Sequence, residues 1–511
     1  MPRLALALSF FALLLAFPAF AADPPAADGP MTLRARQRVE TEKGSGKWHI
    51  VGHKLQWKPQ ETAIVICDMW DQHWCQGATR RVADMAPAMN RTVELARKQG
   101  MLVIHCPSSC MEAYKDTPQF ARAQKAPKVE TKVPLQGWCR IDDKHEAALP
   151  IDDNDGGCDC SPTCKHGSPW KRQIATLQIG ADDAITDSAQ AYYLMRERGI
   201  KNVIVMGVHV NMCVLGRPFS IRQLTYQGMN VALMRDLTDS MYNSRSSPKV
   251  AHHRGTELVV EHIEKYWCPT IESTDFTGLA PFRFADDSRP QISFLINTQE
   301  YKTETTIPAF AQDLQDRFGY YTQILHGEPG RGFVGTDGLA RANLAVVFAR
   351  REAIHEKQKG DLEAFLAAGK PLIGLRTASH AFGARGKLPE GFVAWENFDP
   401  TVFGGSYKGH GPEGSEIQVV AAAAEHPVLA GIKEAKWTSS GSLYNVLPID
   451  AKATVLLEGT NRGGGKTEPV AWVRPYGKSR IFYTSLGHPD DFAAGPFKEM
   501  LMNAVQWQLK K

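Results

Sequence analysis

A buried strand that runs into a cysteine-bearing turn constrains this chain more than any other stretch. Residues 203–206 are uniformly apolar and predict a buried strand, and a turn over 207–212 leads directly to Cys213. Residues 214–227 predict a helix that ends at Gly228, and residues 231–234 predict the next strand. This order is typical of parallel strands that are connected through helices. Cys213 is therefore expected at a strand-to-helix turn.

The position of Cys213 supports two interpretations. At the start of a helix, the thiol lies near unpaired N–H groups and the positive end of the helix dipole. That setting lowers a thiol pKa and supplies donors to an oxyanion, as a nucleophile needs. The alternative is a small apolar residue packed beneath a helix, which is the common fate of a free cysteine.

Polar residues end two neighbouring predicted strands. Residues 63–68 predict a strand that ends in Asp68, residues 86–99 predict a helix, and residues 102–105 predict a strand that ends in His105. The carboxyl ends of parallel strands meet at one edge of a sheet. Asp68, His105 and Cys213 are therefore expected to share a crevice.

The alternation of strands and helices continues and then begins a second time, which predicts an α/β fold. The expected fold has two three-layer domains, each with a mainly parallel sheet flanked by helices. In the first domain, a strand near 174–179 and helices over 187–198 and 259–267 complete the pattern. In the second, strands are expected at 292–296, 322–325, 344–348, 372–375, 470–474 and 480–484, and helices at 307–318, 361–368 and 497–509.

Composition shifts divide the chain of 511 residues. The predicted parts are a signal peptide (1–21), an extended N-terminal arm (22–60), a first domain (61–271) with a Cys-rich insertion (about 107–172), a linker (272–289) and a second domain (290–511).

The first residues predict export. Arg3 precedes an apolar stretch over 4–17, and Ala19-Phe20-Ala21 fits the small-x-small cleavage pattern. No cysteine follows that site as a lipoprotein requires, and no later stretch is long and apolar enough to span a bilayer. A periplasmic or extracellular protein is expected. The net charge of +4 gives no case for nucleic acid as a partner.

The chain has ten cysteines, and export permits disulfides. Four of them, Cys139, Cys158, Cys160 and Cys164, lie in the insertion. A disulfide-pinned loop is favoured over a metal knuckle, because the Cys-x-Cys-x3-Cys spacing lacks a clear second ligand pair. The sequence leaves the pairing open.

Over roughly residues 60–270 the chain resembles the isochorismatase-like cysteine hydrolases. The resemblance is carried by the strand that ends in Asp68 and by residues 207–214, Gly-Val-His-Val-Asn-Met-Cys-Val. It implies a catalytic triad of Asp, Lys and Cys, with Cys213 as the nucleophile and Asp68 as its base. It also implies a cis peptide at Val208-His209 that leaves the N–H groups of Met212 and Cys213 free as an oxyanion hole.

The family's lysine has no counterpart. It is expected near residues 178–180, where this chain has Gln-Ile-Gly, and Lys171 or Arg172 of the insertion are the nearby cations in sequence. Some family members bind a metal, and Asp71, His73 and His105 resemble that ligand set for a divalent ion such as zinc. Each has an ordinary alternative, as a helix cap, a surface residue and a core residue respectively. No other cofactor is indicated.

Over roughly residues 290–510 the chain resembles the ThuA-like family, which is related in fold to class I glutamine amidotransferases. Residues 425–432, 469–472 and 480–488 carry this resemblance. The amidotransferase nucleophile would follow the strand at 372–375, where residues 376–380 contain no cysteine. The family's association with sugar metabolism implies carbohydrate recognition. His380, His410 and His488 are the candidate site residues.

Two functions compete. The first is an exported cysteine-dependent hydrolase that cleaves C–N (amide-type) bonds of a small molecule through an acyl-thioenzyme, with an accessory ThuA-like domain. The alternative is a non-catalytic extracellular carbohydrate-binding protein built on two degenerate enzyme folds. A homo-oligomer is left open.

Overall fold

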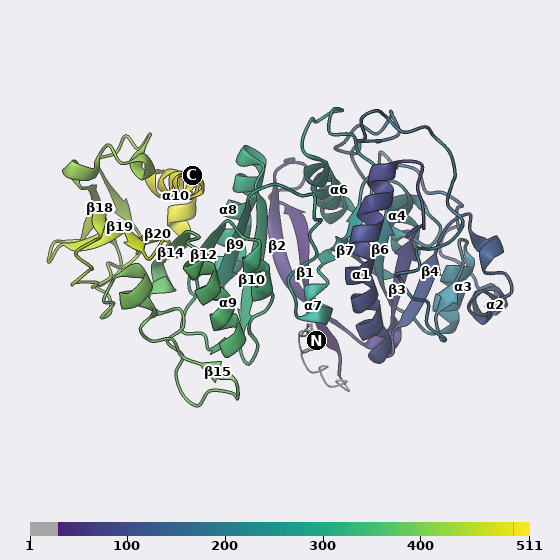
Figure 1. Ribbon diagram of the computed structural model, residues 1–511, viewed down its shortest axis with the longest axis horizontal. Coiled ribbons are helices and arrows are strands. Elements are labelled where there is room, and N and C mark those ends of the chain that lie inside the picture. Colours follow the sequence, from purple (N-terminus) through teal and green to yellow (C-terminus); the bar gives the residue numbers. More distant parts are fainter. Residues whose placement is uncertain (1–28, 494, 511) are drawn as a thin grey trace, which may run out of the picture.

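Two α/β domains lie side by side in the computed structural model, which describes residues 29–493 and 495–510 (Figure 1). The predicted signal peptide falls outside the described residues. Each domain is a large sheet covered by helices, as the sequence predicts. No helix of the described part of the chain is long and apolar enough to cross a membrane.

The first sheet has the strand order β2-β1-β8-β7-β6-β3-β4-β5. Its parallel centre forms because the central strands are apolar on both faces, which requires cover on both sides. The six parallel strands of this sheet are β3 (Thr62–Cys67), β4 (Leu102–Cys106), β5 (Ala184–Ile185), β6 (Asn202–Val208), β7 (Asn230–Asp239) and β8 (Thr270–Ile271).

Helices cover the two faces of this sheet in separate apolar clusters. Ile64 and Ile66 of β3 pack with α1 (Gln76–Lys98), whereas Val65 and Cys67 point to the opposite face. That opposite face carries α2 (Pro118–Lys125), α3 (Gln190–Glu197), α4 (Cys213–Gly216), α5 (Ile221–Tyr226) and α6 (His252–Tyr266). The alternation is the ordinary consequence of strand geometry.

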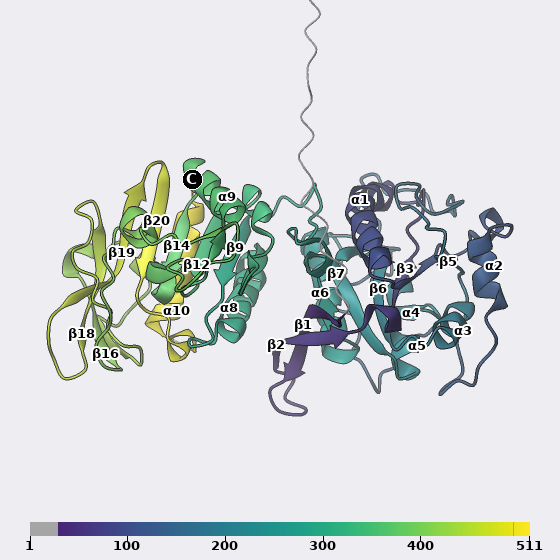
Figure 2. The same ribbon diagram turned by 90° about the horizontal axis from the view of Figure 1, so that it is seen from below.

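The expected N-terminal arm is a hairpin. Strands β1 (Met31–Glu40) and β2 (Trp48–Trp57) pair antiparallel, and β1 joins the first sheet through β8. Figure 2 shows the hairpin at the side of the first domain that faces the second domain. The Arg38 guanidinium donates to Gln312 of α8 (Thr303–Phe318) at 2.6 Å, so the hairpin also contacts the second domain.

The second sheet is mixed. Five strands run parallel, and the remainder add antiparallel on both sides, in the order β11-β10-β9-β12-β14-β20-β19-β18-β16-β17. The parallel strands are β9 (Gln291–Ile296), β10 (Tyr321–Glu328), β12 (Leu344–Phe348), β14 (Leu372–Leu375) and β20 (Ser479–Thr484). The others are β11 (Gly332–Phe333), β16 (Ser415–Val419), β17 (Lys436–Ser439), β18 (Thr454–Asn461) and β19 (Glu468–Tyr476).

Helices α8 and α10 (Pro496–Leu509) pack on one face of this sheet and α9 (Glu356–Ala367) on the other. A small separate sheet pairs β13 (Ile354–His355) with β15 (Phe392–Val393).

Three predicted elements differ from the structure. Residues 174–179 form no strand, and the edge position is taken by β5. The single helix expected over 214–227 is two short helices, α4 and α5, separated at Arg217-Pro218. The expected linker is packed rather than extended, because it contains α7 (Thr274–Thr277) and buries Phe276 and Phe284 in the core of the first domain.

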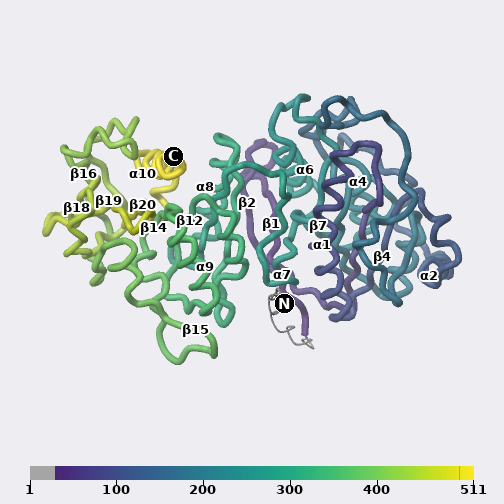
Figure 3. Tube along the Cα trace, in the orientation of Figure 1, coloured from purple at the N-terminus to yellow at the C-terminus, as the bar shows by residue number. Residues whose placement is uncertain are grey.

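The long insertion between β4 and β5 is tied to the first domain by a buried carboxylate. Its path is drawn in blue in Figure 3. Glu146 is 3% exposed and accepts from Arg222 at 2.7 and 2.9 Å, from His262 at 2.7 Å and from Trp267 at 2.9 Å. Burial alone would raise the pKa of Glu146, but the hydrogen bonds from His262, Arg222 and Trp267 outweigh it and lower that pKa to about 2. Glu146 thus fastens the insertion to α5 and α6.

Replacing this carboxylate should destabilise the protein. Glu146→Gln keeps the side-chain shape but leaves the buried Arg222 charge uncompensated, at a cost of about 3–5 kcal/mol in the free energy of unfolding. The pKa of Glu146 is lowered in the fold, so its stabilisation is present above the usual glutamate pKa and is lost as pH falls toward about 2. Urea unfolding at neutral and acidic pH measures both effects, and the difference between variant and wild type should shrink in acid.

The exposed Glu130 of the same insertion is the matched control. Glu130→Gln should change the free energy of unfolding by less than about 0.5 kcal/mol. Equal urea midpoints for both variants and the wild type would contradict the role given to Glu146.

Candidate active site

Asp68 is a fully buried carboxylate at the end of β3. Its backbone has φ of 46°, in the left-handed region that aspartate tolerates better than most residues, and this turns the side chain off the end of the strand. Its Oδ1 accepts from the backbone N–H of Ser108 at 2.7 Å, whereas Oδ2 has no ordinary hydrogen-bond donor among the described residues. Burial raises the pKa of the Asp68 carboxyl. A buried carboxylate with one uncommitted oxygen is suited to accept a proton.

Cys213 begins α4, which follows β6, the neighbour of β3 in the sheet. The two strands approach closely where Gly207 lies opposite Cys67. A Cβ on Gly207 would lie 2.1 Å from the Cys67 carbonyl oxygen, and Gly207 has φ of 105°, so only glycine fits there. The close approach sets the ends of the two strands, and hence Asp68 and Cys213, side by side.

The Asp68 carboxylate and the Cys213 thiol lie close enough for each to shift the pKa of the other, although the two residues are far apart in the sequence. Cys213 is 8% exposed. Burial and the adjacent Asp68 charge raise the pKa of the Cys213 thiol well above its ordinary value. The resting thiol is therefore protonated, contrary to the lowered pKa expected for a cysteine at the start of a helix.

Arg217 supplies the cation that the sequence did not reveal. Its Nε lies 4.0 Å from Asp68 Oδ2, and its charge lowers the pKa of both Asp68 and Cys213, opposing the effect of burial. Arg217 follows α4, and the residue before a proline is driven out of the helical region, here to φ −70° and ψ 157°. The Gly216-Arg217-Pro218 sequence was the signal for this break. Lys171 and Arg172, the cations considered from the sequence, instead donate their backbone N–H groups to Asp71 Oδ1.

Trp138 of the insertion covers this corner of the site. The Arg217 guanidinium lies 5.4 Å from the centre of the Trp138 ring, and the backbone N–H of Cys139 donates to the Gly216 carbonyl at 2.6 Å. A Cβ on Gly216 would lie 2.8 Å from the Trp138 ring, so a glycine is needed for this contact. The insertion therefore forms one wall beside the catalytic candidates.

The turn before Cys213 confirms one expectation and corrects another. The Val208-His209 peptide bond is cis, as the resemblance implied. The Met212 N–H is not free, because it donates to the His209 carbonyl at 2.9 Å. Within the described residues, the Cys213 N–H has no intramolecular acceptor and remains the one of the two that could face an oxyanion. The four-residue length of α4 also gives less dipole support than a long helix would.

The three candidate metal ligands do not form a site. His105 uses both ring nitrogens, at 2.8 Å from Gln173 and at 2.8 Å from Asp183. Asp71 Oδ1 accepts from two backbone N–H groups, and His73 Nδ1 accepts from the Cys75 N–H at 3.1 Å. In the described part of the chain these three side chains do not come within ligand distance of one another. The expected zinc set is thus wrong, and His105 is a structural residue rather than part of the Cys213 site.

In the second domain, Arg376 begins the turn after β14 where the sequence placed candidate site residues. It follows β14 with φ of 43° and is 2% exposed. Its guanidinium lies between the rings of Tyr301 and Tyr444, at 4.5 and 4.8 Å from their centres, and donates to the Ser485 carbonyl at 2.8 Å. The residue at this tight turn is thus a buried cation that packs against two aromatic rings.

Two of the three candidate histidines lie near Tyr444, which packs against this arginine. His380 stacks on Tyr407 with ring centres 4.4 Å apart, and His410 lies 6.3 Å from Tyr444. Burial and the nearby arginines, Arg351 first among them, lower the pKa of His380 to about 3, so it is neutral. His488 instead caps a short helix by accepting from the Asp490 N–H at 3.3 Å. His380 and His410 thus both lie near Tyr444, and His488 has a structural role.

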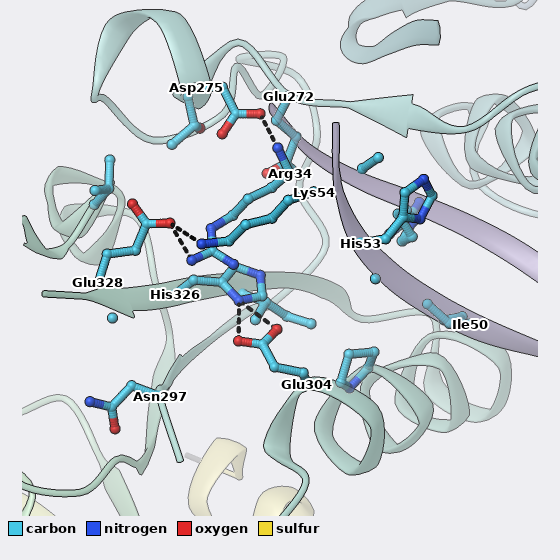
Figure 4. A pocket seen from close by; sticks show the side chains of 18 of the residues that line it. Arg34, Ile50, His53, Lys54, Glu272, Asp275, Asn297, Glu304, His326 and Glu328 are labelled. Carbon is cyan, nitrogen blue, oxygen red and sulfur yellow. Dashed lines mark hydrogen bonds and ion pairs between the residues drawn. The ribbon is translucent and has the colours of Figure 1, made fainter. Parts of the chain in front are cut away.

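A cavity of about 450 Å³ separates the hairpin of the first domain from the second domain (Figure 4). Its charged walls are already paired: Arg34 contacts Glu328, Lys54 lies 3.6 Å from Glu328, and His326 lies 2.9 Å from Glu304. Neither Asp68 nor Cys213 lines it. We interpret the cavity as part of the polar contact between the domains, because its charges satisfy one another.

Sequence comparison identifies the second domain. Residues 297–508 match the family described as ThuA, trehalose utilisation, so this domain is ThuA-like. No curated protein matches the chain in sequence.

Solved structures resemble parts of the chain. A putative ThuA-like protein from Bacteroides uniformis ATCC 8492 is 18% identical, over 45% of this chain and 96% of its own, with a TM-score of 0.34. A cysteine hydrolase from Pseudomonas syringae pv. phaseolicola 1448A is 16% identical, over 43% and 93%, with a TM-score of 0.28. N-carbamoylsarcosine amidase from Thermoplasma acidophilum is 13% identical, over 35% and 83%, with a TM-score of 0.20.

The charge of Arg217 should control the reactivity of Cys213. Because the Arg217 charge lowers the Cys213 pKa, Arg217→Ala should raise that pKa further and slow alkylation of Cys213 by iodoacetamide about tenfold, the effect of one pKa unit. Peptide mass spectrometry across pH measures the rate. Arg217→Lys keeps the charge and should stay within about threefold of the wild-type rate. Unchanged labelling in Arg217→Ala would remove Arg217 from the site.

Proposed function

We propose that the first domain is a cysteine-dependent hydrolase of C–N bonds in a small amide-type molecule. The observation that carries this proposal is the meeting of Asp68, Cys213 and Arg217 at one edge of the sheet. A base, a nucleophile and a cation in contact are the parts that nucleophilic acyl transfer requires. The low exposure of Cys213 favours a small substrate. Because residues 1–21 are predicted to be a signal peptide, we also propose that the enzyme acts after export.

The chemistry follows from the single proton that the pair shares. Asp68 takes the thiol proton, and the sulfur attacks the carbonyl carbon of the substrate. The π electrons of the C=O bond then move onto its oxygen. The Cys213 N–H is placed to donate to that oxyanion. Collapse of the intermediate breaks the C–N bond, and the protonated Asp68 gives its proton to the leaving amine.

The acyl-thioenzyme is then hydrolysed, with Asp68 acting first as a base and then as an acid. Asp68 accepts a proton from water, and the resulting hydroxide attacks the thioester carbonyl. The C–S bond then breaks to release the carboxylic acid, and Asp68 returns its proton to the Cys213 thiolate. Arg217 favours each step in which the sulfur carries negative charge, because it lies beside both the thiol and the carboxylate. No step needs a metal ion.

The proposed roles predict distinct kinetic losses. Across a panel of primary amides and N-carbamoyl compounds, with released ammonia as the readout, Cys213→Ala should abolish turnover of any accepted substrate. Asp68→Asn should lower kcat by about 10²–10⁴-fold, because it removes the general base. Since burial raises the Asp68 pKa, kcat/KM should decline on the acid side at a pH above the ordinary aspartate pKa.

Cys268 is a buried cysteine away from Asp68, and Cys268→Ala is the matched control with wild-type kinetics expected. Equal ammonia release by wild type and Cys213→Ala would end the proposal.

Carbohydrate recognition by the second domain is a second proposed function. It is favoured by the half-buried stacked pair of His380 and Tyr407 beside Arg376, at the end of β14. Aromatic faces pack against the apolar faces of sugar rings, while nearby arginine side chains donate to hydroxyl or acidic groups. The match to a family described by trehalose utilisation supports the same ligand class.

A sugar ligand should stabilise the protein and depend on this pair. Trehalose and a panel of neutral and acidic sugars should include one that raises the Tm of the full chain, and Tyr407→Ala should abolish that shift. Tyr476→Ala, a half-buried tyrosine at the end of β19, is the control and should keep it. A sugar-induced shift that survives in Tyr407→Ala, or no shift with any sugar, would contradict the assignment.

A further inference from the structure

Four cysteines from two distant segments converge at the start of α1. Cys75 immediately precedes the helix, and Cys158, Cys160 and Cys164 come from the insertion. Their four sulfur atoms all lie within 4.8 Å of one another. None of these cysteines forms a disulfide; all ten cysteines of the chain are free thiols. The disulfide-pinned loop expected from the sequence is therefore wrong.

The spacing of the sulfurs fits a tetrahedral metal site. A Zn–S bond of about 2.3 Å places the corners of a regular tetrahedron about 3.8 Å apart. The sulfurs of Cys75 and Cys160 lie 3.8 Å apart. Four sulfur ligands in this arrangement select zinc or iron rather than a hard cation such as magnesium.

The backbone around the cluster is arranged to stabilise negatively charged sulfur. The N–H of Gly77 donates to Cys160 Sγ at 3.3 Å, and that of Gln76 donates to Cys164 Sγ at 3.5 Å. The Ala78 N–H donates to the Cys75 sulfur. These are the unpaired N–H groups of the first turn of α1, a helix long enough to have a substantial dipole.

Arg245 holds the loop that carries the other ligands. Its guanidinium donates to the carbonyls of Cys158 and Cys160, at 3.3 Å in each case, and to that of Asp159 at 3.4 Å. The loop is therefore folded so that its cysteines point toward Cys75. We propose that Cys75, Cys158, Cys160 and Cys164 bind one zinc ion in a closed tetrathiolate site.

Such a site is structural, because all four positions are protein ligands and none remains for substrate. It would join the insertion to the start of α1. Cys75 and Cys158 also pack with Met241, and Met212, the residue before Cys213, adjoins the same cluster. The metal would thus stabilise the turn that carries Cys213. The proposed metal site does not depend on a catalytic role for that cysteine.

The metal content of the purified full chain tests the proposal. Inductively coupled plasma mass spectrometry of protein prepared without chelator should find one zinc ion per chain. Cys75→Ser and Cys160→Ser should lose it, because each removes a ligand. Cys139→Ser should keep it, since Cys139 lies in the same insertion but instead donates to Gln223.

A titration of the wild type avoids dependence on variants that fail to fold. A mercurial reagent should release zinc to a chromophoric chelator in step with the modification of four thiols, and Co²⁺ exchange should give the charge-transfer absorption of a tetrahedral thiolate site. Iron in place of zinc would overturn the assignment. Metal-free protein would also overturn it, whether its four thiols are free or oxidised to disulfides as shown by intact mass.

Discussion

The first domain depends on a fully buried carboxylate, Asp68, that lies beside a nearly buried thiol, Cys213. Burial disfavours charge on either group, so ionising both would be costly, and one cation at 4.0 Å is the compensation that the fold provides. The backbone details nearby serve this arrangement. Gly207 permits the approach of β3 and β6, and the break after Gly216 directs Arg217 back toward the pair.

The cation beside Asp68 comes from a different part of the chain than the family resemblance implied. The residues at 178–180, where the family resemblance placed a lysine, form no strand, and Arg97 donates to the Gln178 carbonyl there at 2.7 Å. Arg217 instead lies C-terminal to Cys213 in the sequence, at the end of α4. Its guanidinium is partly exposed and rests against Trp138 of the insertion, so the insertion and the charge balance of the site are physically linked.

Much of the fold could be predicted from the sequence because its central strands are short apolar runs ending in Asp68 or in the turn before Cys213. The pairing of those two residues followed from topology alone. What could not be predicted depended on contacts across the chain. The apolar pattern over 214–227 favoured one helix, whereas the structure breaks it before Pro218. The cysteine that joins Cys158, Cys160 and Cys164 is Cys75, which lies far upstream in the sequence. Likewise, only the fold shows that both ring nitrogens of His105 are hydrogen-bonded, one to Gln173 and the other to Asp183.

Trapping the acyl group tests most directly whether Asp68 generates the thiolate of Cys213. After rapid acid quench during turnover of an accepted amide, peptide mass spectrometry should find the acyl mass on the peptide that contains Cys213. The same adduct should be absent from Asp68→Asn. Turnover with the acyl group on another residue, or an equal Cys213 adduct in Asp68→Asn, would contradict the account.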